Sequence, residues 1–131
     1  MLSIGIKGNL EKIVAKQDTA RVIGSGELDV LATPSMLALI EETAWRSVAS
    51  ELEAGRGTVG TKLEVEHLSA TPVGMKFRCE TELTEIDRRR LVFQVCAYDE
   101  AGLIASGIHE RFVVDNEKFQ AKAYTKLQKE A

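Results

Sequence analysis

Glu41 and His67 are the side chains whose positions favour acid–base chemistry, because each falls on the apolar side of a predicted element. In residues 33–52, TPSMLALIEETAWRSVASEL, a period of about 100° per residue predicts a helix with an apolar stripe, and Glu41 lies near its middle. The neighbouring Glu42 falls on the polar side. The stripe consists of Leu37, Ile40, Ala44, Trp45, Val48 and Leu52. A buried carboxylate needs a partner, so Glu41 is either an active carboxylate or a side chain that reaches solvent from the edge of the stripe.

The start of this predicted helix is marked by Thr33 followed by Pro34. A hydroxyl is a common helix cap, and proline favours the first helical position. The N-terminus of a helix carries free N–H groups and a partial positive charge, so it can bind a carbonyl oxygen that becomes anionic during a reaction. Thr33 is therefore either an ordinary cap or a catalytic hydroxyl, and both interpretations stay open.

His67 belongs to an alternating segment, residues 61–68, in which Leu63, Val65 and His67 share one face. A single histidine on an apolar face is more often a hydrogen-bonded core residue than a catalyst. This face, however, is expected to pack on the helix that carries Glu41. A glutamate and a histidine in contact would each supply the polar partner that the other needs when it is buried. We therefore expect Glu41 and His67 to be neighbours.

Composition narrows the possible classes of protein. The 131 residues fit a single domain, residues 1–131, with enough apolar content (44%) for its own core. A net charge of -3 and only 5% aromatic residues argue against nucleic-acid binding. We expect no membrane association and a cytoplasmic location, since no leader or long apolar run is apparent. Cys79 and Cys96 are predicted to be reduced core thiols, and His67 and His109 have no zinc-ligand spacing, so no metal or cofactor is expected.

The remaining segments predict an antiparallel sheet. Three alternating segments joined by tight turns form a predicted meander, and residues 61–68 add a fourth strand after the helix. Before the helix, two β-favouring runs within residues 10–23 suggest a hairpin or a strand with a turn. The meander strands are residues 75–86, 91–98 and 103–114, and residues 116–131 form a partly helical tail. The predicted fold class is α+β, an antiparallel sheet wrapped around one long central helix, which is the hotdog fold. One such sheet leaves a face or edge uncovered, so a homodimer is expected.

The connection at residues 87–90, Asp-Arg-Arg-Arg, has two interpretations. It is predicted to be a solvated hairpin tip. The alternative is contact with the phosphates of a nucleotide-bearing substrate, which guanidinium groups bind well.

Three segments resemble a known family. They are LATPSMLALIEETAW at residues 31–45, GTVGTKLEVEHLSATPVGM at residues 57–75 and SGIHERFVVDNEKF at residues 106–119. Together they resemble the fluoroacetyl-CoA thioesterase-like family of hotdog-fold acyl-CoA thioesterases. The resemblance implies that Thr33, Glu41 and His67 act together in thioester hydrolysis, and that Gly60 and Arg111 contact the acyl-CoA substrate. A glycine at position 60 also lets the backbone approach a ligand closely. Its other interpretation is a plain turn glycine, and that of Arg111 is a structural ion pair.

The resemblance implies an acyl-CoA thioesterase that releases free acid and CoA. Residues 24–31 contain no aromatic side chain for an apolar lid over a fluorinated acyl group, so we expect a general, small acyl-CoA as substrate. Glu41 would either attack the carbonyl or activate water, and the sequence leaves both routes open. The alternative function is a non-catalytic acyl-CoA or small-ligand binding protein on the same fold. A hydratase ranks last, because neither the helix nor the strand of His67 contains an aspartate.

Overall fold

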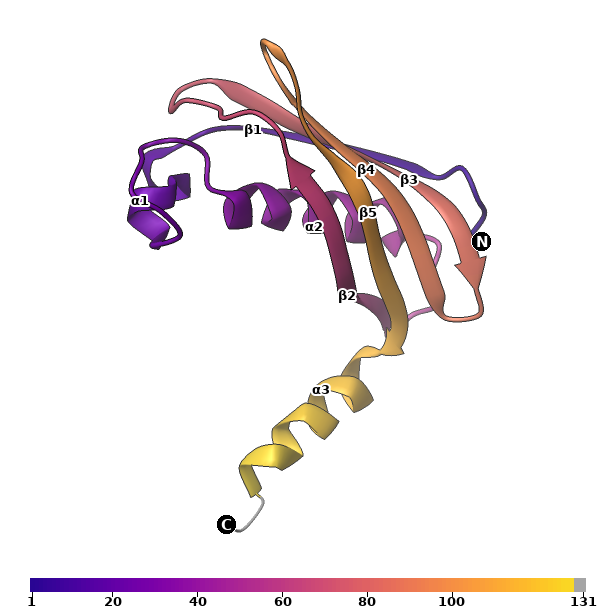
Figure 1. Cartoon of the computed structure of the whole chain (residues 1–131). Helices are drawn as coiled ribbons and strands as arrows, with labels where there is room; N and C mark the ends of the chain where they lie inside the picture. The colour runs from indigo at the N-terminus through magenta and orange to yellow at the C-terminus, as the bar shows by residue number, and fades with distance from the viewer. Residues whose placement is uncertain (129–131) are drawn as a thin grey trace.

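The computed structural model describes residues 1–128, and its centre is a five-stranded antiparallel sheet. The strands follow the order β1-β3-β4-β5-β2, so β1 and β2 are the two edges. Their bounds are β1 Lys7–Ile13, β2 Arg56–His67, β3 Lys76–Asp87, β4 Arg90–Asp99 and β5 Gly102–Asp115. The sheet curves around the long helix α2, Thr33–Ala49, which lies along its concave side (Figure 1). The predicted α+β arrangement of a sheet around one central helix is confirmed.

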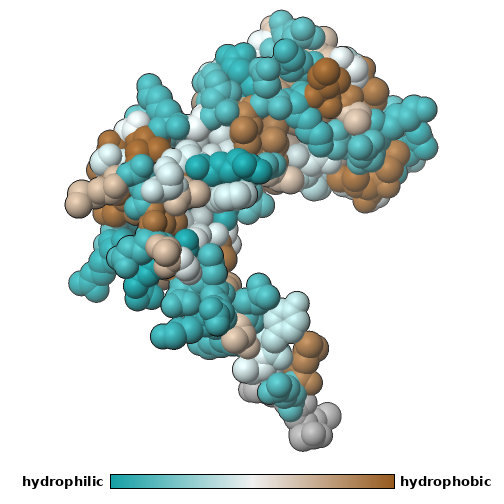
Figure 2. All heavy atoms as spheres, turned by 180° about the vertical axis from the view of Figure 1, so that it is seen from behind, coloured by the Kyte–Doolittle hydropathy of each residue, from teal (hydrophilic) through white to brown (hydrophobic). Residues whose placement is uncertain are grey.

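The segment before α2 differs from the prediction. Residues 20–23, expected to favour a strand, form one helical turn, α1 Ala20–Ile23, after a 3-10 turn η1 at Lys16–Asp18. The cause is side-chain capping. The carboxylate of Asp18 accepts from the amide of Ala15 at 2.9 Å, and Thr19 Oγ1 accepts from the amide of Val22 at 3.4 Å. Apolar surface gathers over this end of the molecule, at the right in Figure 2, where Val22 and Leu28 are exposed.

After β5 the chain continues as α3, Asn116–Tyr124, and a 3-10 turn η2, Thr125–Gln128. Figure 1 shows α3 projecting away from the sheet. The expected partly helical tail is confirmed up to residue 128, and residues 129–131 lie outside the described part of the chain. No helix within residues 1–128 is both long and apolar enough to cross a membrane.

The buried face of α2 is rotated from the predicted stripe. Its buried residues are Met36, Leu39, Ile40, Thr43, Ala44 and Val48. Trp45 is instead 40% exposed, and Leu37 is only partly buried. Thr43 joins the buried face because its hydroxyl donates to the carbonyl of Leu39 at 2.7 Å, which removes the cost of burial. Glu41 therefore lies at the border of the buried face rather than at its middle.

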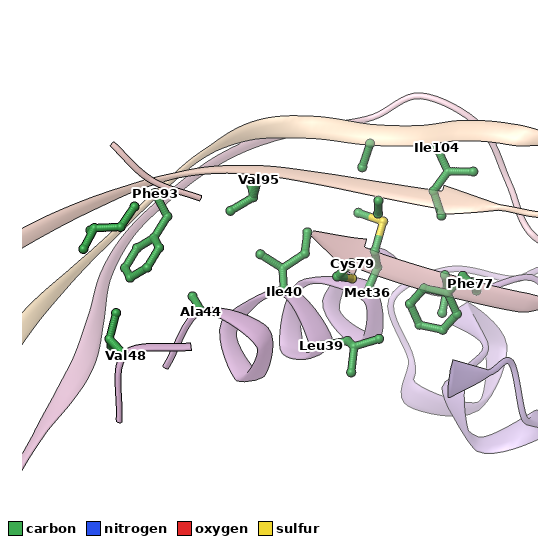
Figure 3. Close-up of a cluster of buried hydrophobic side chains, with 14 of the residues drawn as sticks. Met36, Leu39, Ile40, Ala44, Val48, Phe77, Cys79, Phe93, Val95 and Ile104 are labelled. Carbon is green, nitrogen blue, oxygen red and sulfur yellow. The ribbon is translucent and has the colours of Figure 1, made fainter. Parts of the chain in front are cut away.

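The core lies between α2 and the sheet. Figure 3 shows Met36, Ile40 and Ala44 pointing from the helix toward side chains of β3, β4 and β5, among them Phe77 and Phe93. In β3 the predicted alternation is confirmed, because Phe77, Cys79, Thr81 and Leu83 are buried. β2 is longer than expected and begins at Arg56. This packing fixes α2 against the sheet and so fixes the positions of Thr33 and Glu41.

Candidate active site

Thr33 lies at the first position of α2 and contacts His67. The cap position is Ala32, which offers no capping side chain, so the capping interpretation of Thr33 is wrong. Instead, Thr33 Oγ1 lies 2.8 Å from Nδ1 of His67 at the end of β2. This is a hydrogen-bond distance between a hydroxyl and an imidazole nitrogen, and the tautomer of His67 decides which of the two atoms donates. The structure therefore brings two of the three predicted catalytic residues together.

The second ring nitrogen of His67 is available for chemistry. Nε2 is shielded from solvent and has no hydrogen-bond partner within residues 1–128. Burial lowers the pKa of His67 from its ordinary value of 6.5, against the opposing effect of a backbone hydrogen bond with Ser69, so the imidazole is neutral at pH 7. An unpartnered buried nitrogen is uncommon in folded proteins. A neutral imidazole with one engaged and one open nitrogen can pass a proton between two groups.

A pocket of about 330 Å³ adjoins this pair. Thr33 and His67 line it, together with small and aliphatic residues of the segment before α2 and of the turn after β2: Ala20, Ser25, Val30, Leu31, Ala32, Leu68, Ser69 and Ala70. The segment before α2 is anchored here, because the amide of Leu31 donates to the carbonyl of Thr71 at 2.9 Å and the amide of Ala20 donates to the carbonyl of Val30 at 3.0 Å. The wall beside Thr33 is therefore fixed by backbone hydrogen bonds.

Glu41 belongs to a different cluster, with Gly60 and Arg111. Arg111 Nη1 lies 3.6 Å from Glu41 Oε2, and the arginine side chain is only 6% exposed whereas that of Glu41 is 41% exposed. Gly60 pairs with Arg111 across the β2–β5 ladder. A Cβ atom at position 60 would collide with the carboxylate of Glu41 and lie 3.3 Å from Arg111 Nη1. The structure thus shows a close approach of Glu41 to the backbone of Gly60, and the contact expected between Gly60 and a substrate remains a prediction.

His109 is a member of this second cluster that the sequence analysis did not assign. Its Nε2 lies 3.0 Å from Arg111 Nη1, and Thr58 binds the opposite side of the same guanidinium. Burial lowers the pKa of Arg111, and the charge of Glu41 opposes that shift. The sequence signal that could have found His109 was its spacing from Arg111, since residues two apart on a strand face the same side. A pocket of about 220 Å³ lies beside Glu41, Gly60 and His109.

The expectation that Glu41 and His67 are neighbours and bind each other is wrong within one chain. No hydrogen bond or ion pair joins the two within residues 1–128. Thr33, the partner of His67, is eight residues before Glu41, which corresponds to about 12 Å along a helix. Glu41 pairs with Arg111 instead. This is possible because β5 lies beside β2 and the arginine side chain is long enough to reach the border of α2. Each chain thus contains two separate half-sites, the Thr33–His67 half-site and the Glu41–Arg111 half-site.

Of the three arginines at the β3–β4 hairpin, Arg90 forms two local ion pairs. Arg90 Nη1 donates to Glu85 at 2.9 Å, and Arg90 Nε donates to Glu110 at 3.0 Å. Two carboxylates therefore occupy this guanidinium, which favours the predicted solvated hairpin over phosphate binding. No cluster of three or more metal-ligating side chains occurs in the part of the chain that the structure describes.

Comparison with known proteins identifies the family. The model of the family described as fluoroacetyl-CoA-specific thioesterase matches residues 14–117. The chain is 42% identical over 98 residues to the fluoroacetyl-CoA thioesterase of Streptantibioticus cattleyicolor, covering 75% of this chain and 70% of that protein. The chain belongs to this thioesterase family. The predicted family and the predicted enzyme class, a thioester hydrolase, are confirmed.

Solved structures of related proteins agree with the fold. A crystal structure of the fluoroacetyl-CoA thioesterase superposes with a TM-score of 0.90 at 34% identity, covering 96% of this chain and 98% of that one. A thioesterase superfamily member from Thermus thermophilus gives a TM-score of 0.87 at 26% identity, with 98% and 94% covered. A hot-dog-like protein from Thermanaerovibrio acidaminovorans, at 22% identity, gives 0.86 with 95% and 93% covered. The hotdog fold of this thioesterase family member is confirmed.

Proposed function

We propose that the protein hydrolyses the thioester of a small acyl-CoA, and that Thr33, Glu41 and His67 are its reacting groups. The observation that carries this proposal is the hydrogen bond between Thr33 Oγ1 and His67 Nδ1 at the start of α2, beside a pocket of about 330 Å³. A hydroxyl, a neutral imidazole and a helix N-terminus meet there. These are the groups that a thioester carbonyl needs for activation.

The substrate carbonyl oxygen would lie at the N-terminus of α2. Ala32 provides no side-chain acceptor for the first turn, and its own amide donates to the carbonyl of Asp18. Pro34 has no N–H, so the amides of Thr33 and Ser35 are the ones that could donate to a ligand. Together with the Thr33 hydroxyl and the partial positive charge of the helix end, they would stabilise the oxyanion that forms when the carbonyl is attacked.

Glu41 would supply the attack in one of two ways. Its carboxylate either forms an acyl anhydride that water then hydrolyses, or it takes a proton from the water that attacks the carbonyl. In both routes the carbon–sulfur bond breaks and the sulfur leaves with the bonding electrons. Nδ1–H of His67 would donate to Thr33 Oγ1, which leaves the Thr33 hydroxyl hydrogen for the carbonyl oxygen. Nε2 would accept the proton that water loses, directly or from Glu41, and pass it to the thiolate of CoA. Arg111 Nη1, 3.6 Å from Glu41 Oε2, places a positive charge beside the carboxylate that both routes use.

Because Glu41 is about two helical turns from Thr33, a second copy of the chain would complete the site. β2 is an edge strand, and no other strand of residues 1–128 pairs with its outer side. Antiparallel pairing of two β2 strands would form one continuous sheet and a two-fold interface, in which Glu41 of one copy faces Thr33 and His67 of the other. We therefore propose a homodimer with shared active sites.

The lining of the pocket supports a small acyl group. Its walls beside Thr33 are formed by alanine, valine, leucine and serine side chains. The relative from Streptantibioticus cattleyicolor is named for fluoroacetyl-CoA. No phenylalanine, tyrosine or tryptophan occurs among the residues that line this pocket, so we propose a broader preference for short acyl chains. A cytoplasmic location is also proposed, supported by the two free cysteines, Cys79 and Cys96.

A panel of acyl-CoA thioesters from acetyl to long-chain, including a halogenated acetyl, tests the activity through release of free thiol. We expect hydrolysis of the short members by the wild type and a loss of roughly a thousandfold in kcat in Glu41→Gln. Glu42→Gln is the matched control, because Glu42 is the next residue but pairs with Arg46 at 2.8 Å on the exposed face. Binding of CoA esters without hydrolysis by the wild type would instead identify a binding protein.

Mixing two inactive variants tests the shared site. Thr33→Val and Glu41→Gln are co-refolded in equal amounts. If one copy supplies Glu41 and the other supplies Thr33 and His67, mixed dimers regain one intact site, and about a quarter of wild-type activity returns. A mixture that stays inactive would show that each chain uses only its own residues.

A further inference from the structure

His109 is the most completely buried ionisable side chain beside the Glu41–Arg111 half-site. It lies on β5 and is 0% exposed, with its ring 6.2 Å from that of Phe93. Both of its nitrogens are nonetheless engaged. Nδ1 lies 2.8 Å from the backbone carbonyl of Lys62, and Nε2 lies 3.0 Å from Arg111 Nη1. A buried polar ring is tolerated only when its hydrogen bonds are satisfied.

These two partners determine the protonation of His109. The carbonyl of Lys62 can only accept, so the proton must lie on Nδ1. The guanidinium of Arg111 can only donate, so Nε2 must present a lone pair. Burial and the charge of Arg111 both lower the pKa of His109, against the opposing effects of the Lys62 carbonyl, Glu41 and Glu110. His109 is therefore neutral and confined to a single tautomer.

A distortion of the sheet places the carbonyl that selects this tautomer. The β2–β5 register shifts between Gly60 and Lys62, so Thr61 is an extra residue in β2. Two hydrogen bonds between side chains and backbone carbonyls surround this bulge. The ring of His109 donates to the carbonyl of Lys62, and the hydroxyl of Thr61 donates to the carbonyl of Glu110 at 3.2 Å. The bulge thus links the backbone of β2 to the imidazole ring.

The guanidinium of Arg111 is held on two sides. Nε donates to Thr58 Oγ1 at 2.8 Å, and Nη2 donates to the Thr58 carbonyl at 3.0 Å. Nη1 donates one hydrogen to His109, which leaves its second hydrogen on the side of Glu41 Oε2, 3.6 Å away. Without the acceptor on His109, one buried N–H of Nη1 loses its partner, and only the two hydrogen bonds to Thr58 hold the guanidinium plane.

We propose that His109 is a positioning residue that, as a neutral acceptor, holds Nη1 of Arg111 so that the guanidinium orients and stabilises the carboxylate of Glu41. This proposal rests on the proposed role of Glu41 in hydrolysis. Gly60 completes the arrangement, because the absence of a side chain there lets Glu41, Arg111 and His109 converge on one point.

Two substitutions of His109 separate its two hydrogen bonds. The amide of asparagine occupies the place of Nδ1, so His109→Asn keeps the donor to the Lys62 carbonyl but loses the acceptor for Arg111. Glutamine is longer, so His109→Gln keeps an acceptor for Arg111 near the place of Nε2. We expect kcat to fall by about tenfold or more in the asparagine variant, with KM changed less than about twofold, and to remain near wild type in the glutamine variant.

Arg111→Gln provides the coupling test. In that background the asparagine substitution should cause no further loss, because the group through which His109 acts is gone. The proposal would be overturned if the losses in kcat from Arg111→Gln and His109→Asn multiplied in the double variant. It would also be overturned if His109→Asn and His109→Gln lost the same activity, or if His109→Asn kept the kcat of the wild type.

Nitrogen NMR of the wild-type imidazole gives a result that does not depend on activity. At pH 7 we expect the His109 signals of a neutral ring protonated at Nδ1, and a slowly exchanging Arg111 Nη1–H signal that His109→Asn broadens or removes. A charged ring or the opposite tautomer would overturn the proposal even in an active enzyme. If the protein proved not to hydrolyse thioesters, the expected signals would still establish how Arg111 is held, and only the proposed function would fail.

Discussion

The two half-sites of the chain differ in how completely their polar atoms are satisfied. In the Thr33–His67 half-site, Nε2 of the imidazole has no partner within residues 1–128 and a pocket adjoins it. In the Glu41–Arg111 half-site, both nitrogens of His109 and three N–H groups of Arg111 are bound. An open nitrogen suits proton exchange, whereas a fully bonded network holds a charge in place. The difference indicates that one half-site carries the moving proton and the other fixes the carboxylate.

Among the changes that separate the two half-sites, removal of the Thr33 hydroxyl should have the largest effect after Glu41→Gln, and it should act on one half-site only. Thr33→Val keeps the shape of the side chain but loses its hydrogen bond to His67. We expect kcat/KM for the best acyl-CoA substrate to fall by roughly a hundredfold, because the imidazole loses its orientation and the carbonyl loses a donor. Imidazole NMR signals should move for His67 and stay unchanged for His109.

Thr33→Ser is the matched control, since it retains the hydroxyl, and it should keep most of the activity. If the valine variant were as active as the wild type, the Thr33–His67 hydrogen bond would have no part in the chemistry. If the signals of His109 also moved, the two half-sites would not be structurally independent.

The sequence predicted the residues of both half-sites better than their grouping. Alternation and helical period placed β3, β4, β5 and α2 within a few residues, because these elements have one continuous buried face. The rotation of α2 was missed because Thr43 counts as polar in a periodicity, although its hydroxyl is satisfied within the helix. Local patterns also contain no information on register, so they could not show that Arg111 from β5, rather than His67 from β2, reaches Glu41.

An added methyl group at position 60 should disturb the Glu41–Arg111 half-site alone. The new Cβ of Gly60→Ala would displace the carboxylate of Glu41 and press on Arg111 and His109. Because the colliding carboxylate is the end of a flexible side chain, folding should be little affected. We expect kcat to fall by about tenfold while the midpoint of thermal unfolding changes little.

Gly57→Ala, three residues earlier on β2, is the control, because the atoms nearest to its Cβ would be those of the Asn116 side-chain amide. It should leave kcat unchanged. Equal activity of the two alanine variants would mean that the position of the Glu41 carboxylate does not limit the reaction.

The two histidines should also differ in how they link stability to pH, which is the smallest of these effects. Burial lowers the pKa of both His67 and His109 from 6.5, and the charge of Arg111 lowers that of His109 further. The unfolded chain therefore binds more protons than the folded one between pH 6.5 and the lowered values. In this window the free energy of unfolding decreases as the pH falls, by at most about 1.4 kcal/mol per pH unit for each histidine.

Chemical denaturation between pH 7.5 and about 5 measures this slope, above the range in which the lowered carboxyl pKa values of Glu51 and Glu110 contribute. His109→Gln should remove the larger part of the slope, because His109 is fully buried and faces a permanent cation, whereas His67→Gln should remove the smaller part. If His67→Gln removed the larger part of the slope, the folded structure would lower the pKa of His67 more than that of His109. The contrast between an open and a fully bonded half-site would then be wrong.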